Sequence, residues 1–276
     1  MTAGASPALA TRGVGGIEFL RALLPGVAVD AFWLLTWLGS VAFLTALLAL
    51  VYWFESREGG ALALAALLGA LGLTMAAKAL FGLPRPPAAL WRIGADGFGF
   101  PSGHAIAATV GWGALAAVLD RGTRERRLAV AAVVVALVAV SRVALGVHYV
   151  LDVVAGVVVG VALLGAVLRL GDAGRAFGAA TLLAVLATAA TGGSGDAVLL
   201  LGVTVGGWLT WARLSVPAAP WRRDGLLPAA GGAAAVSLVA VVGYRLDLGA
   251  PVELAVGAVA GAIVLGLPAL LVWRSD

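Results

Sequence analysis

The sequence has no cysteine in 276 residues, which excludes disulfide bonds and thiolate metal sites. Charged residues are also scarce: they make up 12% of the chain, while hydrophobic residues make up 62%. A soluble domain is typically about one quarter charged and about half apolar. The formal net charge of +4 comes almost wholly from arginine, and membrane topology explains it better than nucleic acid does. We therefore expect a membrane protein with no nucleic acid partner.

The apolar residues fall into runs of about 20, long enough to cross a bilayer as helices. They predict an all-α fold, a polytopic transmembrane helical bundle of about nine spans. Ahead of them, Ile17–Leu24 mixes apolar and charged residues and is too short to span, so we interpret it as an N-terminal interfacial helix. The predicted spans are 27–54, 61–82, 103–119, 128–146, 149–169, 176–191, 197–213, 226–243 and 252–273.

Basic residues in the loops predict the orientation of the bundle, because they favour the cytoplasmic side. With loop 55–60 inside, most loop arginines lie inside, including the cluster at 121–127. The N-terminus and the loop 83–103 then face outward. We therefore predict a multi-pass protein of the cell membrane, with residues 83–103 on the extracytoplasmic side.

Residues suited to chemistry gather in three clusters that share this outer face. The only lysine of the chain and both of its histidines lie in them. The clusters are Lys78 with Arg85, the PSGH of Pro101–His104, and the SRVALGVHYVLD of Ser141–Asp152.

The third cluster predicts an oriented nucleophile. His148 and Asp152 are four residues apart, so on a helix they share one face. A carboxylate there can accept a hydrogen bond from one ring nitrogen, which leaves the other nitrogen free to attack.

The remaining residues predict a site for a tetrahedral oxyanion. Ser102 and Gly103 stand where a helix begins, and helix N-termini bind anions. The cations of Lys78, Arg85 and Arg142 suit phosphate oxygens. Because no cluster of carboxylates offers itself to Mg²⁺, these cations would take the electrostatic role of a metal.

Each residue also has an ordinary interpretation. Lys78 could snorkel at the end of a span, His148 could be a satisfied buried histidine, and Asp152 could cap a helix. Taken together these interpretations weaken, because ionisable groups within a membrane are costly and tend to be functional.

The three clusters match K-x6-R-P, PSGH and S-R-x5-H-x3-D, and together they resemble the signature of the type 2 phosphatidic acid phosphatase family. Its superfamily also includes bacterial class A acid phosphatases, glucose-6-phosphatase and vanadium haloperoxidases. The resemblance covers about residues 30–170. It implies that His148 attacks phosphorus, that Asp152 supports it and that His104 protonates the leaving oxygen. It also implies phosphate binding, with no cofactor, by Lys78, Arg85, Ser102, Gly103 and Arg142.

The resemblance implies an integral membrane, metal-independent phosphatase that acts through a phosphohistidine. The expected substrate is a lipid phosphate monoester or diphosphate, similar to phosphatidic acid or a polyprenyl (di)phosphate, with membrane lipids as further partners. We divide the chain into an N-terminal segment (1–26), a catalytic core (27–170) and a four-span region of unknown role (171–276). Phosphoryl transfer to an acceptor other than water, vanadate-dependent peroxidation, and lipid or anion transport remain open as alternatives.

Overall fold

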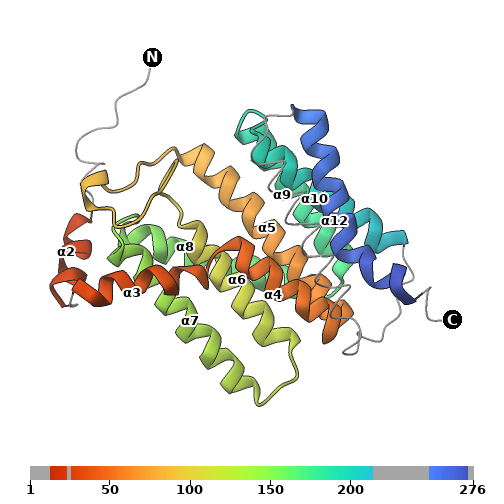
Figure 1. Cartoon of the computed structure of the whole chain (residues 1–276), viewed down its shortest axis with the longest axis horizontal. Coiled ribbons are helices and arrows are strands. Elements are labelled where there is room, and N and C mark those ends of the chain that lie inside the picture. Colours follow the sequence, from red (N-terminus) through yellow and green to blue (C-terminus); the bar gives the residue numbers. More distant parts are fainter. Residues whose placement is uncertain (1–12, 24–25, 214–248, 273–276) are drawn as a thin grey trace.

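The computed structural model describes residues 13–23, 26–213 and 249–272, and this part of the chain is built of helices without strands (Figure 1). The predicted all-α class is therefore confirmed. The first helix of the described part, α2 (Val14–Leu23), corresponds to the predicted interfacial helix. It lies at one end of the molecule, beside the start of α3 (Gly26–Trp37).

The predicted span 27–54 is divided in the structure. The segments Ala31–Trp37 of α3 and Val41–Phe54, which is α4, are bent by 47° relative to each other. Ser40 causes α4 to start anew, because its side chain accepts a hydrogen bond from the Phe43 N–H at 3.2 Å. The bend brings the end of α3 close to α6 and α7: a Cβ on Gly39 would come within 3.1 Å of the His104 carbonyl oxygen.

Four helices form the part of the bundle that carries the predicted motifs. They are α5 (Arg57–Phe81), α6 (Gly103–Val118), α7 (Arg124–Ala144) and α8 (Val150–Leu170). At one end of the bundle, α5 and α7 end and α6 and α8 begin (Figure 1). Between α5 and α6, residues 82–102 contain a single turn of 3-10 helix, Ala88–Leu90, so the longest interruption is largely non-helical, as the prolines and glycines predict.

The C-terminal helices pack through small residues. α9 (Ala173–Ala190) lies on α5, and a Cβ on Gly72 would approach the Leu183 carbonyl carbon to 3.0 Å. α10 (Gly195–Arg213) crosses α12 (Ala250–Val272) so closely that a Cβ on Gly202 would overlap the backbone of α12. Small residues allow such close approach of membrane helices.

Six described helices are long and apolar enough to cross a membrane, or seven if the bent pair counts as one span. The protein is therefore a multi-pass membrane protein. α6 is shorter, at 16 residues, and the predicted span 226–243 lies outside the described residues. The predicted count of nine is not confirmed.

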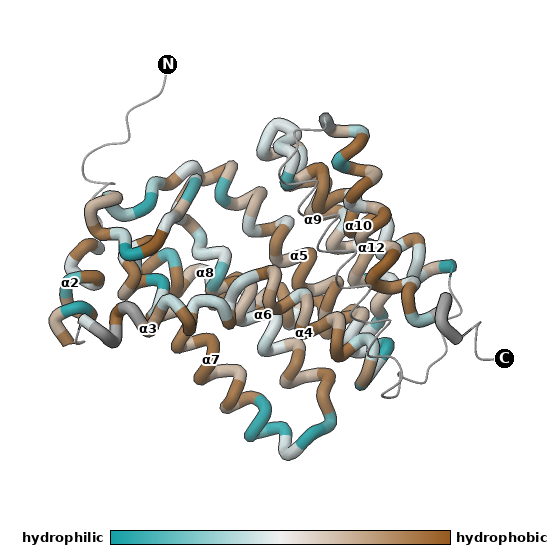
Figure 2. Tube along the Cα trace, viewed as in Figure 1, coloured by the Kyte–Doolittle hydropathy of each residue, from teal (hydrophilic) through white to brown (hydrophobic). Residues whose placement is uncertain are grey.

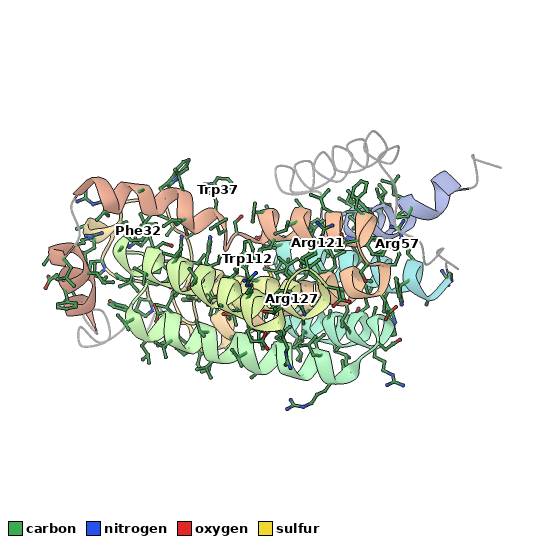
Figure 3. All side chains as sticks on the ribbon, turned by 90° about the horizontal axis from the view of Figure 1, so that it is seen from below. Phe32, Trp37, Arg57, Trp112, Arg121 and Arg127 are labelled. Atoms are coloured by element: carbon green, nitrogen blue, oxygen red, sulfur yellow. The ribbon has the colours of Figure 1, made fainter. Side chains whose placement is uncertain are left out.

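Hydrophilic residues gather at two opposite ends of the bundle (Figure 2). One is the loop between α5 and α6, and the other is the turn between α6 and α7. The two ends are separated by the length of α7, which has 21 residues and is about 30 Å long. At the second end, seen in Figure 3, the Arg121 guanidinium binds both carboxylate oxygens of Glu55, at 3.0 and 2.6 Å. Which end faces the outside stays a prediction.

Candidate active site

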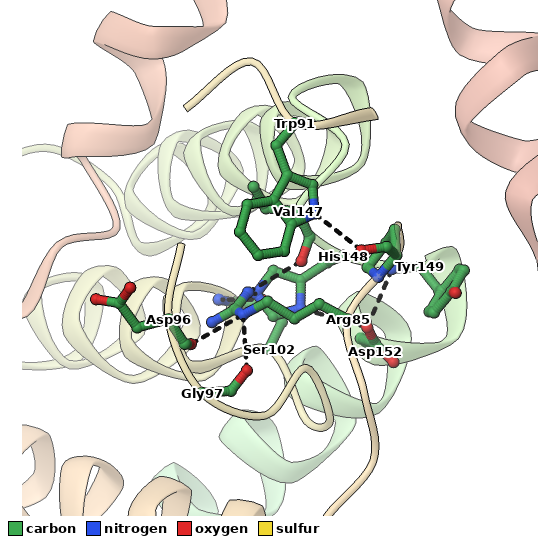
Figure 4. Close-up of polar contacts among 11 residues, drawn as sticks. Arg85, Trp91, Asp96, Gly97, Ser102, Val147, His148, Tyr149 and Asp152 are labelled. Atoms are coloured by element: carbon green, nitrogen blue, oxygen red, sulfur yellow. Dashed lines mark hydrogen bonds and ion pairs between the residues drawn. The ribbon is translucent and has the colours of Figure 1, made fainter. Parts of the chain in front are cut away.

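A histidine and a carboxylate meet at the turn between α7 and α8. His148 lies in this turn, and its Nδ1 is 3.3 Å from Oδ2 of Asp152 in the first turn of α8 (Figure 4). The same Oδ2 accepts the backbone N–H of Tyr149 at 3.0 Å. The side chains of His148 and Asp152 are 1% and 0% exposed, so the pair is held in a fixed, dry position.

The other ring nitrogen of His148 faces an arginine. Nη1 of Arg85 lies 3.1 Å from His148 Nε2, and it also donates to the Val147 carbonyl oxygen at 2.9 Å. A guanidinium can only donate hydrogen bonds, so Nε2 must be the acceptor. Nδ1 therefore carries the proton and donates it to Asp152, while Nε2 keeps a lone pair on the side of Arg85.

The loop between α5 and α6 holds Arg85 in this place. Its Nε donates to the carbonyl oxygens of Asp96 and Gly97, at 2.9 and 3.2 Å (Figure 4). The loop closes on itself through a hydrogen bond from the Gly99 N–H to the Leu83 carbonyl oxygen, at 2.8 Å. The guanidinium is thus oriented by backbone carbonyls.

The surroundings of His148 favour its neutral form. Burial lowers the pKa of His148 well below its usual value, and the charges of Arg85, Arg142 and Lys78 lower it further, against a hydrogen bond with the Gly99 backbone. Desolvation and neighbouring cations both disfavour an imidazolium. At neutral pH the Nε2 lone pair is therefore available.

The start of α6 is joined directly to the His148–Asp152 pair. The N–H of the fully buried Ser102 donates to the Asp152 carbonyl oxygen at 2.9 Å, which ties the starts of α6 and α8 together. Ser102 also caps α6, since its Oγ accepts the Ala105 N–H at 3.5 Å. Gly103 follows as the first helical residue, where a Cβ would come within 3.0 Å of Thr74 Cγ2. The positive end of the α6 dipole therefore lies at the cluster.

Arg142 is fixed by a residue that the sequence analysis missed. Its Nη1 donates to Oγ1 of Thr36, at the end of α3, at a distance of 2.7 Å. Both residues are buried, with exposures of 4% and 6%. The only signal in the sequence is a hydroxyl inside the apolar stretch WLLTW, which does not reveal its partner.

His104 and Lys78 complete the group. His104 is in the first turn of α6 and Lys78 in the last turn of α5. His104 is close enough to Arg142 and Lys78 for their charges to act on it. The structure thus brings all the predicted site residues to one end of the bundle, while their roles stay predictions.

The side chains of the site are suited to an anionic ligand rather than to a metal ion. Among the described residues, no three His, Cys, Asp or Glu side chains are grouped as metal ligands would be. The site instead combines Lys78, Arg85 and Arg142 with a helix start, a set that suits a phosphate group.

The helix α2 is attached to this site, which the sequence analysis did not foresee. Arg21 of α2 donates from Nε to the Ala144 carbonyl oxygen at 3.0 Å and from Nη2 to the Leu90 carbonyl oxygen at 2.6 Å. Gly146 allows this approach: its φ is 75°, and a Cβ there would overlap the Leu90 carbonyl oxygen. Arg21 thus joins the loop after α5 to the turn that carries His148.

Comparison with known families finds a match for the segment that carries these motifs. A family model described as the PAP2 superfamily matches residues 59–176, an interval that contains every predicted site residue, although Thr36 and Arg21 lie outside it. No curated protein and no solved structure matches the chain.

Proposed function

We propose that the protein is an integral membrane phosphatase that hydrolyses a lipid phosphate. The proposal is supported by the match of residues 59–176 to the model of the PAP2 superfamily, which includes lipid phosphatases. The substrate is a monoester or a diphosphate of a lipid alcohol. The observation that carries the proposal is the buried His148–Asp152 pair, whose Nε2 lone pair faces the guanidinium of Arg85.

Phosphate binding begins with the cations. Lys78, Arg85, Arg142 and the start of α6 hold the phosphoryl oxygens and balance their charge. Phosphate oxygens are better acceptors for a guanidinium than an imidazole is, because the resulting hydrogen bonds are charge-assisted. Nη1 of Arg85 therefore moves its hydrogen bond from His148 Nε2 to the phosphate, and the Nε2 lone pair becomes free beside the phosphorus.

The first chemical step transfers the phosphoryl group to the enzyme. His148 Nε2 forms a bond to phosphorus while the bond from phosphorus to the leaving oxygen breaks in line with it. His104 gives its proton to that oxygen, so the lipid leaves as a neutral alcohol or a protonated phosphate. Asp152 accepts the Nδ1 proton in a hydrogen bond and stabilises the positive charge that the ring acquires.

The second step returns the enzyme to its starting state. His104, now unprotonated, takes a proton from a water molecule as the water oxygen bonds to phosphorus. The bond from phosphorus to Nε2 breaks, and orthophosphate leaves with the oxygen of water. The cations that held the first transition state hold the second in the same way.

The lipid character of the substrate follows from the position of the cluster. It lies where apolar helices of membrane-spanning length end, so a phosphate there sits at the membrane surface while its hydrocarbon chain stays among the lipids. The substrate then enters sideways from its leaflet.

The test is phosphate release by the purified protein from phosphatidic acid, polyprenyl phosphate and polyprenyl diphosphate, with EDTA present and the His148→Ala variant as control. We expect release to survive chelation and to be inhibited by vanadate, whose five-coordinate form resembles the transition state. Loss of turnover in EDTA that Mg²⁺ restores would overturn the mechanism. A phosphorylated acceptor among the products would indicate a transferase, and lipid flux in liposomes without hydrolysis a transporter.

A further inference from the structure

A pocket of about 460 Å³ opens beside Lys78, on the side of α5 that faces α9. It has three walls: the last turn of α5, the loop after α5, and the end of α9. The residues that matter here are Lys78, Ala79, Asp96, Phe98, Ala190 and Thr191. Ligand pockets in proteins commonly fall between about 300 and 1,000 Å³.

Two of the walls also belong to the proposed phosphate site. Lys78 lines the pocket and is one of the cations whose charge acts on His148. Asp96 and Gly97 line it too, and their carbonyl oxygens are those that accept the Nε of Arg85. The pocket is thus the space next to the phosphate cations.

The third wall comes from outside the segment that matches the family. Ala190 is the last residue of α9 and Thr191 its C-cap, whereas the family match ends at residue 176. This end of α9 is held firmly. Thr191 donates from its N–H and from Oγ1 to the Ala187 carbonyl oxygen, at 2.9 and 2.8 Å. Ala187 is itself buried against Ala76 of α5.

From this arrangement we infer that the pocket receives the part of the substrate that is attached to the phosphate, and that Ala190 and Thr191 determine which substituent fits. The inference rests on the proposed phosphatase function and adds to it a role for the helices that follow the family segment. The residues concerned touch the substituent and take no part in bond making.

The wall chemistry indicates the class of that substituent. A cation, a carboxylate and a hydroxyl share the surface with the apolar Ala79, Phe98 and Ala190. An uncharged carbon skeleton that bears oxygen atoms, such as an acylated glycerol, matches this mixture.

Cysteine protection tests occupancy of the pocket without any turnover. Because the chain has no cysteine, Thr191→Cys introduces a unique thiol, and Ser194→Cys places one in the same turn on an exposed residue that does not line the pocket. The probe is a phosphonate analogue of an acylated glycerol phosphate, in which a methylene replaces the ester oxygen. We expect it to slow maleimide labelling of Thr191→Cys roughly tenfold and to leave Ser194→Cys unchanged, while orthophosphate protects neither. Unprotected Thr191→Cys, or equal protection of both, would overturn the inference.

A filled pocket gives the second measurement. In Ala190→Leu the larger side chain projects into the space, so kcat/KM for an acylated glycerol phosphate should fall roughly tenfold or more relative to ethyl phosphate, which needs no pocket. An unchanged ratio of the two values would contradict the inference while leaving the phosphatase intact. Failure of the proposed function has a different signature, since the wild-type protein would then release phosphate from neither ester.

Discussion

Removal of the Thr36 hydroxyl should weaken phosphate binding through Arg142. Thr36→Val keeps the shape of the side chain but deletes the acceptor that lies 2.7 Å from Arg142 Nη1. Both residues are buried, so water does not readily replace the lost partner. A hydrogen bond to a charged group is worth about 1.5–3 kcal/mol.

The loss should appear in the kinetics as a change in binding. Because the hydrogen bond forms before the substrate binds, its full free energy sets the upper limit of the effect. At about 1.4 kcal/mol for each factor of ten, kcat/KM should fall by at most about 10- to 150-fold. If Arg142 holds the phosphate equally in the ground state and the transition state, KM should rise and kcat should change little. The assay is phosphate release from a lipid monoester over a range of substrate concentrations, with EDTA present.

Two control variants separate the hydrogen bond from packing. Thr36→Ser keeps the acceptor and should stay within a fewfold of wild type. Thr109→Val removes another buried hydroxyl, one that donates to the Ala105 carbonyl oxygen of its own helix at 2.7 Å, and should leave KM unchanged. Wild-type kinetics in Thr36→Val would refute the reasoning, as would a loss in Thr36→Ser as large as that in Thr36→Val.

The other predictions concern the histidines, pH and orientation. A rapid quench with labelled p-nitrophenyl phosphate should trap phosphoenzyme in His104→Ala, because its leaving group needs no proton, and none in His148→Ala; label in the latter would mean that the nucleophile is assigned wrongly. The pKa of His148 is lowered by burial and, among the charges, most by Arg85. We therefore expect kcat/KM to fall in acid only at a pH well below the usual histidine pKa of about 6.5. Arg85→Gln should move that loss to higher pH, and an unmoved profile would contradict this origin. In intact cells, a cysteine at Gly97 should react with an impermeant reagent while one in the loop 121–127 should not; the reverse result would place the site on the cytoplasmic side.

The local part of the site could be predicted from the sequence. The spacing of His148 and Asp152 predicts that their side chains meet, and the structure places Nδ1 and Oδ2 3.3 Å apart. His148, however, lies in the turn before α8, so the predicted shared helix face is wrong. The proline and glycine content of the loop 83–103 predicts an interruption, and the structure has one there. These inferences depend on neighbours in the chain, where a separation of a few residues keeps two side chains within reach of each other.

Contacts between distant segments could not be predicted in this way. Thr36 meets Arg142 across 106 residues, and Arg21 meets Ala144 across 123. A single sequence holds no periodicity that pairs such positions, since they are set by how the helices pack. The bend after Trp37 is a similar case: apolar residues continue on both sides of it, and Gly39 and the cap at Ser40 mark the break without giving its angle.

The packing of α9 on α5 fixes the orientation of α5, and a small rotation of this long helix would displace its far end. This helix has 25 residues and is about 37 Å long, with Lys78 in its last turn and glycines along the face that α9 covers. In a chain that ended after α8, lipid chains would replace α9 and would no longer fix the tilt of α5. A rotation of about 5° about its first turn would displace the Lys78 end by about 3 Å. Since misplacement by about 1 Å is enough to slow an enzyme strongly, we expect the packing of α9 on α5 to be needed for the position of Lys78, although α9 supplies no reacting atom.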